Sequence, residues 1–189
     1  MTPNDPTVLP PGLPVPVDDG AADHLPGQAV PALTLPSTTG EPVDLAAAAG
    51  GTLVLFCYPR TGRPGEDPPP GWDDIPGARG CTPQACAFRD HHDELAGLGA
   101  RVLGLSAQPQ EEQLEAVGRL GLPYPLLSDP RLALAAALRL PTFEAGGMRL
   151  YRRLTLVARA GRVAHVLYPV FPPDRNAAEV AAWLRRHPA

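Results

Sequence analysis

The spacing of apolar residues along the 189-residue chain predicts alternating strands and helices. Residues 52–58 form a continuous apolar run ended by Pro59, which is typical of a central strand buried on both faces. Elsewhere, apolar positions three and four residues apart predict amphipathic helices. These two patterns predict further strands at 102–105, 124–127, 154–157 and 163–168, and helices from 82 to Gly97, at 110–120, 132–138 and 176–186.

A small hairpin is expected ahead of this series. Apolar residues alternate over 30–35, before a turn at 37–40, and resume at Val43 and Leu45. The remaining elements follow the order β-α-β-α-β-α-β-β-α. Alternating strands and helices that end in a hairpin and a helix predict an α/β fold with a mixed central sheet flanked by helices. This is the element order of a thioredoxin-like fold.

Two proline-rich segments lie outside this pattern. Residues 1–25 contain six prolines, between positions 3 and 16, and little that could form a core, so we expect an extended or disordered arm. Residues 60–80 form a loop rich in proline and glycine, and loops of about twenty residues inside a compact domain are usually functional or disordered. We therefore expect a single domain over 26–189 with the loop 60–80 inserted in it.

The charge balance narrows the class of partner. The chain carries 16 basic and 20 acidic residues, a net charge of −4, and its basic residues are scattered arginines. This balance argues against binding to nucleic acid or to an anionic membrane surface. No stretch approaches the ~20 apolar residues that span a bilayer, and residues 1–19 lack the order of a secretory signal. We expect a cytoplasmic protein with reduced thiols.

Candidate chemistry lies in residues 80–86, which read GCTPQAC. We expect Thr82 to cap a helix and Pro83 to take its first position, so that Cys81 lies just ahead of the helix N-terminus. A thiol is nucleophilic as its thiolate, which both a helix N-terminus and a nearby cation favour. The alternative for an isolated cysteine is a buried structural thiol. The second cysteine close by, Cys86, favours a functional interpretation.

The spacing of Cys81 and Cys86 restricts how the two can react. On a regular helix, residues five apart have Cα atoms roughly 8–9 Å apart, whereas a disulfide needs less than about 7 Å. The pair can close only if the first turn of the helix unwinds. Such a pair suits a catalytic cycle in which Cys81 attacks a peroxide and becomes a sulfenic acid. Cys86 then condenses with it to a disulfide that an external dithiol reduces.

The same segment, extended to Asp90, closely resembles the active-site helix of peroxiredoxins of the bacterioferritin-comigratory (peroxiredoxin Q) class. Residues 53–59 resemble the strand of that class that ends in Tyr-Pro, and residues 122–129 (LPYPLLSD) resemble its mid-chain segment. Residues 153–156 (RLTL) are similar to its Arg-x-Thr-Phe strand, and the resemblance covers about residues 25–186.

The resemblance implies a thiol-dependent peroxidase that reduces hydrogen peroxide and alkyl hydroperoxides, with Cys81 as the peroxidatic and Cys86 as the resolving cysteine. Arg153 would hold the thiolate and polarise the peroxide, because its charge persists at any working pH. By spacing alone Arg152 is an equal candidate, since alternation points one inward and the other outward. A thioredoxin- or glutaredoxin-like protein would be the reductant. We expect no cofactor, and a monomer or weak homodimer.

The sequence departs from the family at the hydroxyl that binds peroxide. The family pattern is Pro-x-x-x-Thr/Ser-x-x-Cys, whereas here Ala78 stands three residues before Cys81 and the loop separates Pro59 from it. Thr61 supplies the hydroxyl if the loop bulges out between Gly62 and Arg79. This is a hypothesis about peroxide binding and leaves the reaction class unchanged.

Other residues and patterns in the sequence suggest different functions. Cys57, in the central strand, is expected to be a core thiol. His91 and His92 suggest zinc, but the usual closely spaced Cys-Cys knuckle is absent, so we expect no metal. A thiol–disulfide oxidoreductase on the same fold usually carries Cys-x-x-Cys, which this chain lacks. A non-catalytic interaction protein that binds partners through the arm and the loop is the remaining alternative.

Overall fold

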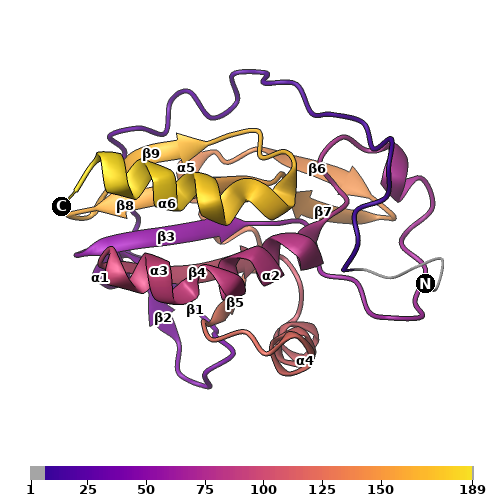
Figure 1. Cartoon of the computed structure of the whole chain (residues 1–189), viewed down its shortest axis with the longest axis horizontal. Coiled ribbons are helices and arrows are strands. Elements are labelled where there is room, and N and C mark those ends of the chain that lie inside the picture. The colour runs from indigo at the N-terminus through magenta and orange to yellow at the C-terminus, as the bar shows by residue number, and fades with distance from the viewer. Residues whose placement is uncertain (1–6, 189) are drawn as a thin grey trace.

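A computed structural model describes residues 7–188. Its centre is a five-stranded mixed sheet in the order β5-β4-β3-β8-β9 (Figure 1). The central strand β3 runs parallel to β4 and antiparallel to β8, while β5 and β9 form the two edges. The strands are β3 (Thr52–Cys57), β4 (Ala100–Ser106), β5 (Leu126–Ser128), β8 (Leu154–Arg159) and β9 (Arg162–Leu167).

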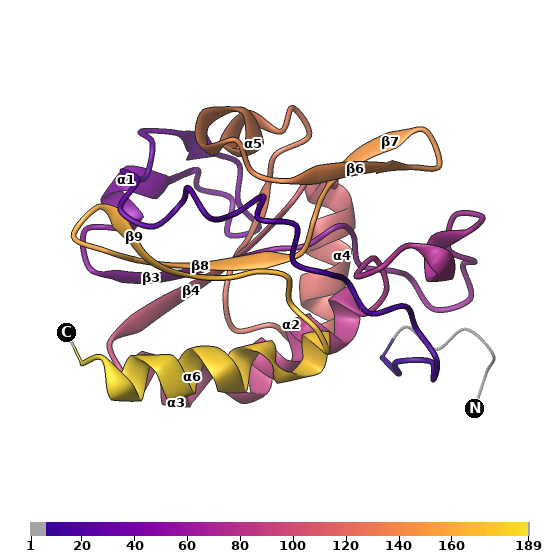
Figure 2. The ribbon, with the colours of Figure 1, turned by 90° about the horizontal axis from the view of Figure 1, so that it is seen from above.

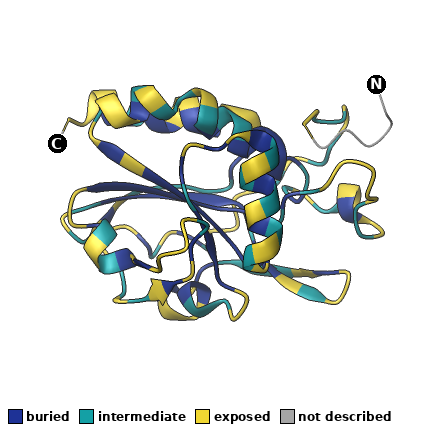
Figure 3. Ribbon diagram, turned by 90° about the horizontal axis from the view of Figure 1, so that it is seen from below, coloured by how far each residue is buried: buried dark blue, intermediate teal, exposed yellow. Residues whose placement is uncertain are grey.

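Helices cover both faces of the sheet, because successive side chains of a strand point to opposite faces. Leu53 and Leu55 of β3 join a core with α1 and α5, whereas Val54 and Phe56 join a core with α2, α3, α4 and α6 (Figure 2). Buried residues line the central strands and the inward sides of the helices (Figure 3). The helices are α1 (Leu45–Ala48), α2 (Cys81–Asp90), α3 (His92–Gly97), α4 (Gln110–Leu120), α5 (Ala133–Leu138) and α6 (Asn176–Arg186), and none in the described part is long and apolar enough to cross a membrane.

The structure confirms the predicted α/β class, the mixed sheet and the leading hairpin. That hairpin pairs β1 (Thr34–Leu35) with β2 (Val43–Asp44), antiparallel and outside the central sheet. The closing hairpin turns at Ala160 and Gly161, whose φ angles are 47° and 76°. This left-handed pair is the geometry that a two-residue hairpin turn requires.

One hairpin was not predicted. β6 (Thr142–Ala145) and β7 (Met148–Tyr151) pair antiparallel around the glycine turn 146–147. Neither strand contains an apolar run, because each has four residues of mixed polarity. The hairpin instead packs on the inserted loop, where Trp72 and Ala78 form a separate small core with Ala145 and Leu150.

Helix α2 begins two residues earlier than the sequence predicts. Cys81 is its first residue, and the cap is Gly80 with φ 101° and no side-chain cap bond, so Thr82 is not the cap and Pro83 is third. A Cβ at position 80 would lie 2.4 Å from Pro173 Cγ and 2.7 Å from Leu9 Cδ2. Close packing and a positive φ both favour glycine here, and they place the sulfur at the helix N-terminus.

The described part of the N-terminal arm contains no helix or strand and runs along the surface of the molecule (Figure 1). Ala22 and Leu25 are buried in the core, so the packed domain begins a few residues before position 26. Tyr168 also donates a hydrogen bond from its hydroxyl to Asp19 Oδ1 at 2.9 Å. The expectation for residues 1–6 lies outside the described residues.

Candidate functional site

The sulfur of Cys81 lies against the guanidinium of Arg153. Arg153 directly precedes β8 and donates from Nη2 to Cys81 Sγ at 3.1 Å, and each of the two residues is only 3% exposed. Its neighbour Arg152 lies over the ring of Phe143, 5.9 Å from the centroid. The structure therefore decides between the two arginines that spacing left equal: Arg153 faces the sulfur.

Backbone carbonyls at the end of the inserted loop fix the orientation of Arg153. Its Nε donates to Gly77 O at 3.3 Å, and its Nη2 donates to Ala78 O at 3.1 Å and Arg79 O at 3.2 Å. Its Nη1 donates to the side-chain oxygen of Gln84. With bonds from three of its nitrogens, the guanidinium has little freedom to turn away from the sulfur.

Cys86 lies on the same helix but faces a different cavity. The three cysteines of the chain are free thiols, and Cys86 is only partly buried in the intact helix α2. Burial raises the pKa of the Cys86 thiol. The side chain lines a hollow of about 320 Å³ together with Thr7 and Leu9 of the arm. The arm therefore lies beside the part of α2 that must unwind before the two sulfurs can meet.

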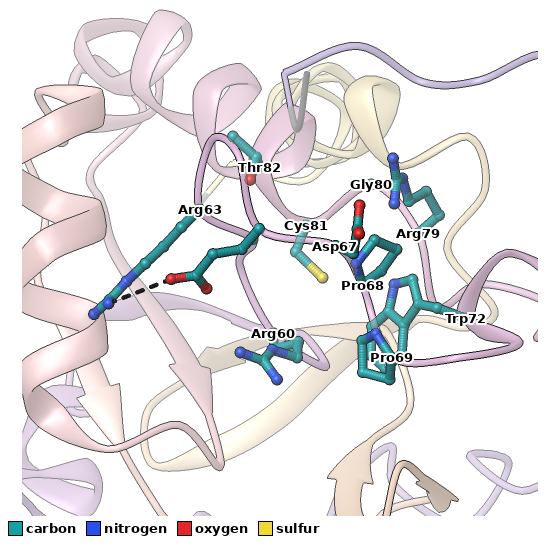
Figure 4. Close-up of a pocket in the computed structure, with 12 residues that line it drawn as sticks. Arg60, Arg63, Asp67, Pro68, Pro69, Trp72, Arg79, Gly80, Cys81 and Thr82 are labelled. Atoms are coloured by element: carbon teal, nitrogen blue, oxygen red, sulfur yellow. Dashed lines mark ion pairs between the residues drawn. The ribbon is translucent and has the colours of Figure 1, made fainter. Parts of the chain in front are cut away.

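A pocket of about 60 Å³ opens at Cys81 (Figure 4). Most of its wall comes from the inserted loop, which contributes the apolar side chains of Pro68, Pro69 and Trp72. Trp72 also packs on the β6–β7 hairpin, with its ring centroid 6.1 Å from that of Phe143. Three arginines add positive charge, and each has an acidic partner: Arg60 with Glu112, Arg63 with Glu66 and Glu115, and Arg79 with Asp73.

Of the predicted site residues, Cys81 lines this pocket, whereas Thr61, Cys86 and Arg153 line other cavities. The neighbours of Thr61, Arg60 and Gly62, line the pocket, whereas Thr61 lines a second cavity beside α4. The Thr61 hydroxyl donates to Gln108 Oε1 at 3.2 Å. Among the described residues that line the pocket, Thr82 is the one with a hydroxyl side chain.

The other polar candidates lie elsewhere. Cys57 is fully buried in β3, and burial raises its pKa strongly. His91 bonds through Nδ1 to Glu94 Oε2 at 2.7 Å, and the ring of His92 stacks near that of Tyr124. Within residues 7–188, no group of three or more histidine, cysteine or acidic side chains is arranged to hold a metal ion.

Sequence reasoning missed three polar side chains behind Arg153. Gln84 donates from Nε2 to Asn176 Oδ1 at 2.9 Å, and Thr155 donates from Oγ1 to the same oxygen at 2.7 Å. All three are fully buried. Gln84 and Thr155 lie inside the segments that carry the family resemblance, whereas Asn176 carries no signal beyond its place at the start of a predicted helix.

Known proteins resemble this chain in both sequence and fold. The model of the family described as Redoxin matches residues 25–182. "Peroxiredoxin Q, chloroplastic" of Arabidopsis thaliana is 37% identical over 103 residues, which are 54% of this chain and 41% of that protein. "Peroxiredoxin Bcp" of Bacillus subtilis is 32% identical over 141 residues, which are 72% of this chain and 80% of that protein.

A solved structure agrees with these matches. The crystal structure of peroxidoxin BcpB from Mycobacterium tuberculosis has a TM-score of 0.71 and 30% sequence identity, and the match covers 88% of this chain and all of that one. The similarity to the Arabidopsis protein spans less than half of that protein's length. The family match, the Bacillus relative and the shared fold agree, and the chain belongs to the Redoxin family, in the peroxiredoxin Q and Bcp class of peroxiredoxins.

Proposed function

We propose that this protein is a thiol peroxidase that reduces hydrogen peroxide and alkyl hydroperoxides with Cys81 as the attacking residue. The observation that carries the proposal is the 3.1 Å contact between Cys81 Sγ and Arg153 Nη2 at the N-terminus of α2. A cation and a helix N-terminus both favour a thiolate over a thiol. Membership of the peroxiredoxins supports the same reaction class.

In the first step the Cys81 thiolate attacks one oxygen of the peroxide. The S–O bond forms as the O–O bond breaks, and the leaving oxygen takes a proton to become water or an alcohol. Sulfur is oxidised to the sulfenic acid while the peroxide is reduced. Arg153 stabilises the thiolate and the negative charge that develops on the leaving oxygen, and it is already oriented to do so.

In the second step Cys86 resolves the sulfenic acid. The first turn of α2 unwinds, the Cys86 thiolate attacks Cys81 Sγ, and hydroxide leaves and is protonated to water. The resulting disulfide is reduced by a dithiol protein of the thioredoxin or glutaredoxin type, whose own thiols become a disulfide. Each turnover reduces one peroxide and oxidises two thiols of the reductant protein, so the cycle balances without a cofactor.

Single-turnover chemistry tests this proposal. The reduced protein is mixed with one equivalent of hydrogen peroxide, and its disulfides are mapped by peptide mass. We expect a rapid Cys81–Cys86 bond that is lost in both Cys81→Ser and Cys86→Ser, with Cys86→Ser still consuming one equivalent. Cys57→Ala, which changes a thiol buried in the core, is the matched control and should form the bond. Peroxide consumption that survives Cys81→Ser would overturn the proposal.

A further inference from the structure

Buried hydrogen bonds connect the reactive sulfur to the first residue of α6. They run from Cys81 to Arg153, from Arg153 to Gln84, and from Gln84 to Asn176. Gln84 and Asn176 are both 0% exposed, and they lie 92 residues apart in the sequence. The position of the guanidinium at the sulfur therefore depends on α6, which carries none of the residues in contact with the pocket.

The arginine dictates the orientation of both amides. A guanidinium only donates hydrogen bonds, so the oxygen of the Gln84 amide must face Arg153 and its NH₂ must point away. That NH₂ needs an acceptor, and Asn176 Oδ1 supplies it at 2.9 Å. The hydroxyl of Thr155 donates to the same oxygen at 2.7 Å. Asn176 thus holds Gln84 in the one orientation that binds the arginine.

Asn176 makes these bonds at a cost that other residues would avoid. Among the described residues its Nδ2 has no hydrogen-bond partner, and an unpaired buried NH₂ group is destabilising. An aspartate would accept the same two bonds without an unpaired donor. Its carboxylate would also place a negative charge behind the arginine, where it would compete with the thiolate for the field of that cation. Asparagine is the residue that accepts both bonds and stays neutral.

We infer that Asn176 is a positioning residue of the peroxidase reaction. Acting through Gln84, it fixes the Arg153 guanidinium against Cys81 while leaving the charge of the arginine directed at the sulfur. The inference rests on the proposed function for its catalytic meaning, but the placement of the guanidinium can be tested without peroxide.

The test compares variants in a Cys86→Ser background, which leaves Cys81 as the thiol that lines the pocket, whereas Cys57 is fully buried in the core and burial raises its pKa. Two quantities are measured: the alkylation rate of Cys81 by iodoacetamide as a function of pH, and the rate constant with hydrogen peroxide at neutral pH. Asn176→Asp keeps the shape and both acceptor bonds. We expect it to move the alkylation profile to higher pH and to slow the peroxide reaction about tenfold, the factor that corresponds to about 1.4 kcal/mol of lost thiolate stabilisation.

Two further variants separate positioning from folding. Asn176→Leu removes the acceptor, so the peroxide reaction should slow and the alkylation profile should again move to higher pH. Val180→Ala, at a buried apolar position of the same helix whose side chain takes no part in these hydrogen bonds, should lower the melting temperature but leave both profiles unchanged. An Asn176→Asp protein that matches its parent in both measurements, or that changes only in melting temperature, overturns the inference. A parent that alkylates normally but never reacts with peroxide overturns the proposed function instead.

Discussion

Replacing Arg153 by methionine removes the charge that faces Cys81 while keeping an unbranched side chain of similar length. The guanidinium is almost fully buried, with Nη2 3.1 Å from the sulfur. At an effective dielectric constant of about 20, two unit charges about 4 Å apart attract by about 4 kcal/mol. Desolvation of the pair offsets part of this attraction, so we take roughly 2–3 kcal/mol as the loss at the barrier.

That loss corresponds to a reaction with hydrogen peroxide that is about 30- to 150-fold slower. Arg153→Lys retains the charge but cannot bond Gly77, Ala78, Arg79 and Gln84 together, so its rate should fall between those of the wild type and Arg153→Met. Stopped-flow measurement of the first oxidation step, under excess peroxide, gives the rate constants directly.

Arg152→Met is the matched control for this experiment. It removes the same charge one residue away, where the side chain lies over Phe143 and not at the sulfur, so its rate should stay close to wild type. Arg153→Met also leaves buried carbonyls without a donor, which costs about 1–3 kcal/mol of stability, and thermal melts check that the variant is folded at the assay temperature. If Arg153→Met reacts within threefold of wild type, or if Arg152→Met is impaired equally, the assignment of the cation fails.

Three further predictions concern resolution and substrate choice. Leu9 packs at Gly80, where α2 begins, so Leu9→Ala should loosen the first turn of the helix. The loss of about 1 kcal/mol of contact should speed disulfide formation after oxidation roughly fivefold. Val17→Ala, at an exposed position of the same arm, is the control, and equal rates in the two variants would exclude a restraint by the arm. Burial raises the pKa of Cys86, so in the reduced protein its alkylation should gain rate only at a pH above the range of a free thiol. Disulfide closure follows unwinding of the first turn of α2, so its rate should begin to rise at a lower pH than the alkylation rate of Cys86 does. If alkylation and stopped-flow measurements of closure give the same pH profile, the helix need not open. Trp72 lines the pocket, so Trp72→Ala should lower the rate with cumene hydroperoxide relative to hydrogen peroxide roughly fivefold in a steady-state assay, and an unchanged ratio would show that the loop does not select bulky substrates.

The elements predicted well from sequence are those whose patterns are long and local. The helix at Asn176–Arg186 has the predicted bounds, and β3 was recognised from its apolar run. The β6–β7 hairpin was missed because its stability comes from packing on a loop that is distant in the chain, through Trp72 and Leu150. Short strands of mixed polarity have too little pattern of their own to be recognised.

The residues of the candidate site also differ in how far the sequence predicts them. Cys81 and Cys86 are five residues apart, so one helix and its geometry were enough to relate them. The choice of Arg153 over Arg152 needed either the family resemblance or the structure, because both sides of a strand end are open to an arginine. Asn176 could not be recognised at all, since its role depends on the contact between α6 and α2.

The inserted loop changes the peroxide-binding motif of the family in this chain but still orients Arg153. The loop replaces the expected hydroxyl position by Ala78, and Thr61 bonds to Gln108 instead of lining the pocket. The carbonyls at its end, however, hold the guanidinium of Arg153 at the sulfur. The hydroxyl and the guanidinium would both act on the bound peroxide, but only the guanidinium also favours the thiolate. Thr82→Val, at the pocket, should therefore slow peroxide turnover more than Thr61→Val does, while both variants keep the alkylation rate of Cys81. If only Thr61→Val slows turnover, the hydroxyl that binds peroxide is that of Thr61 in the loop.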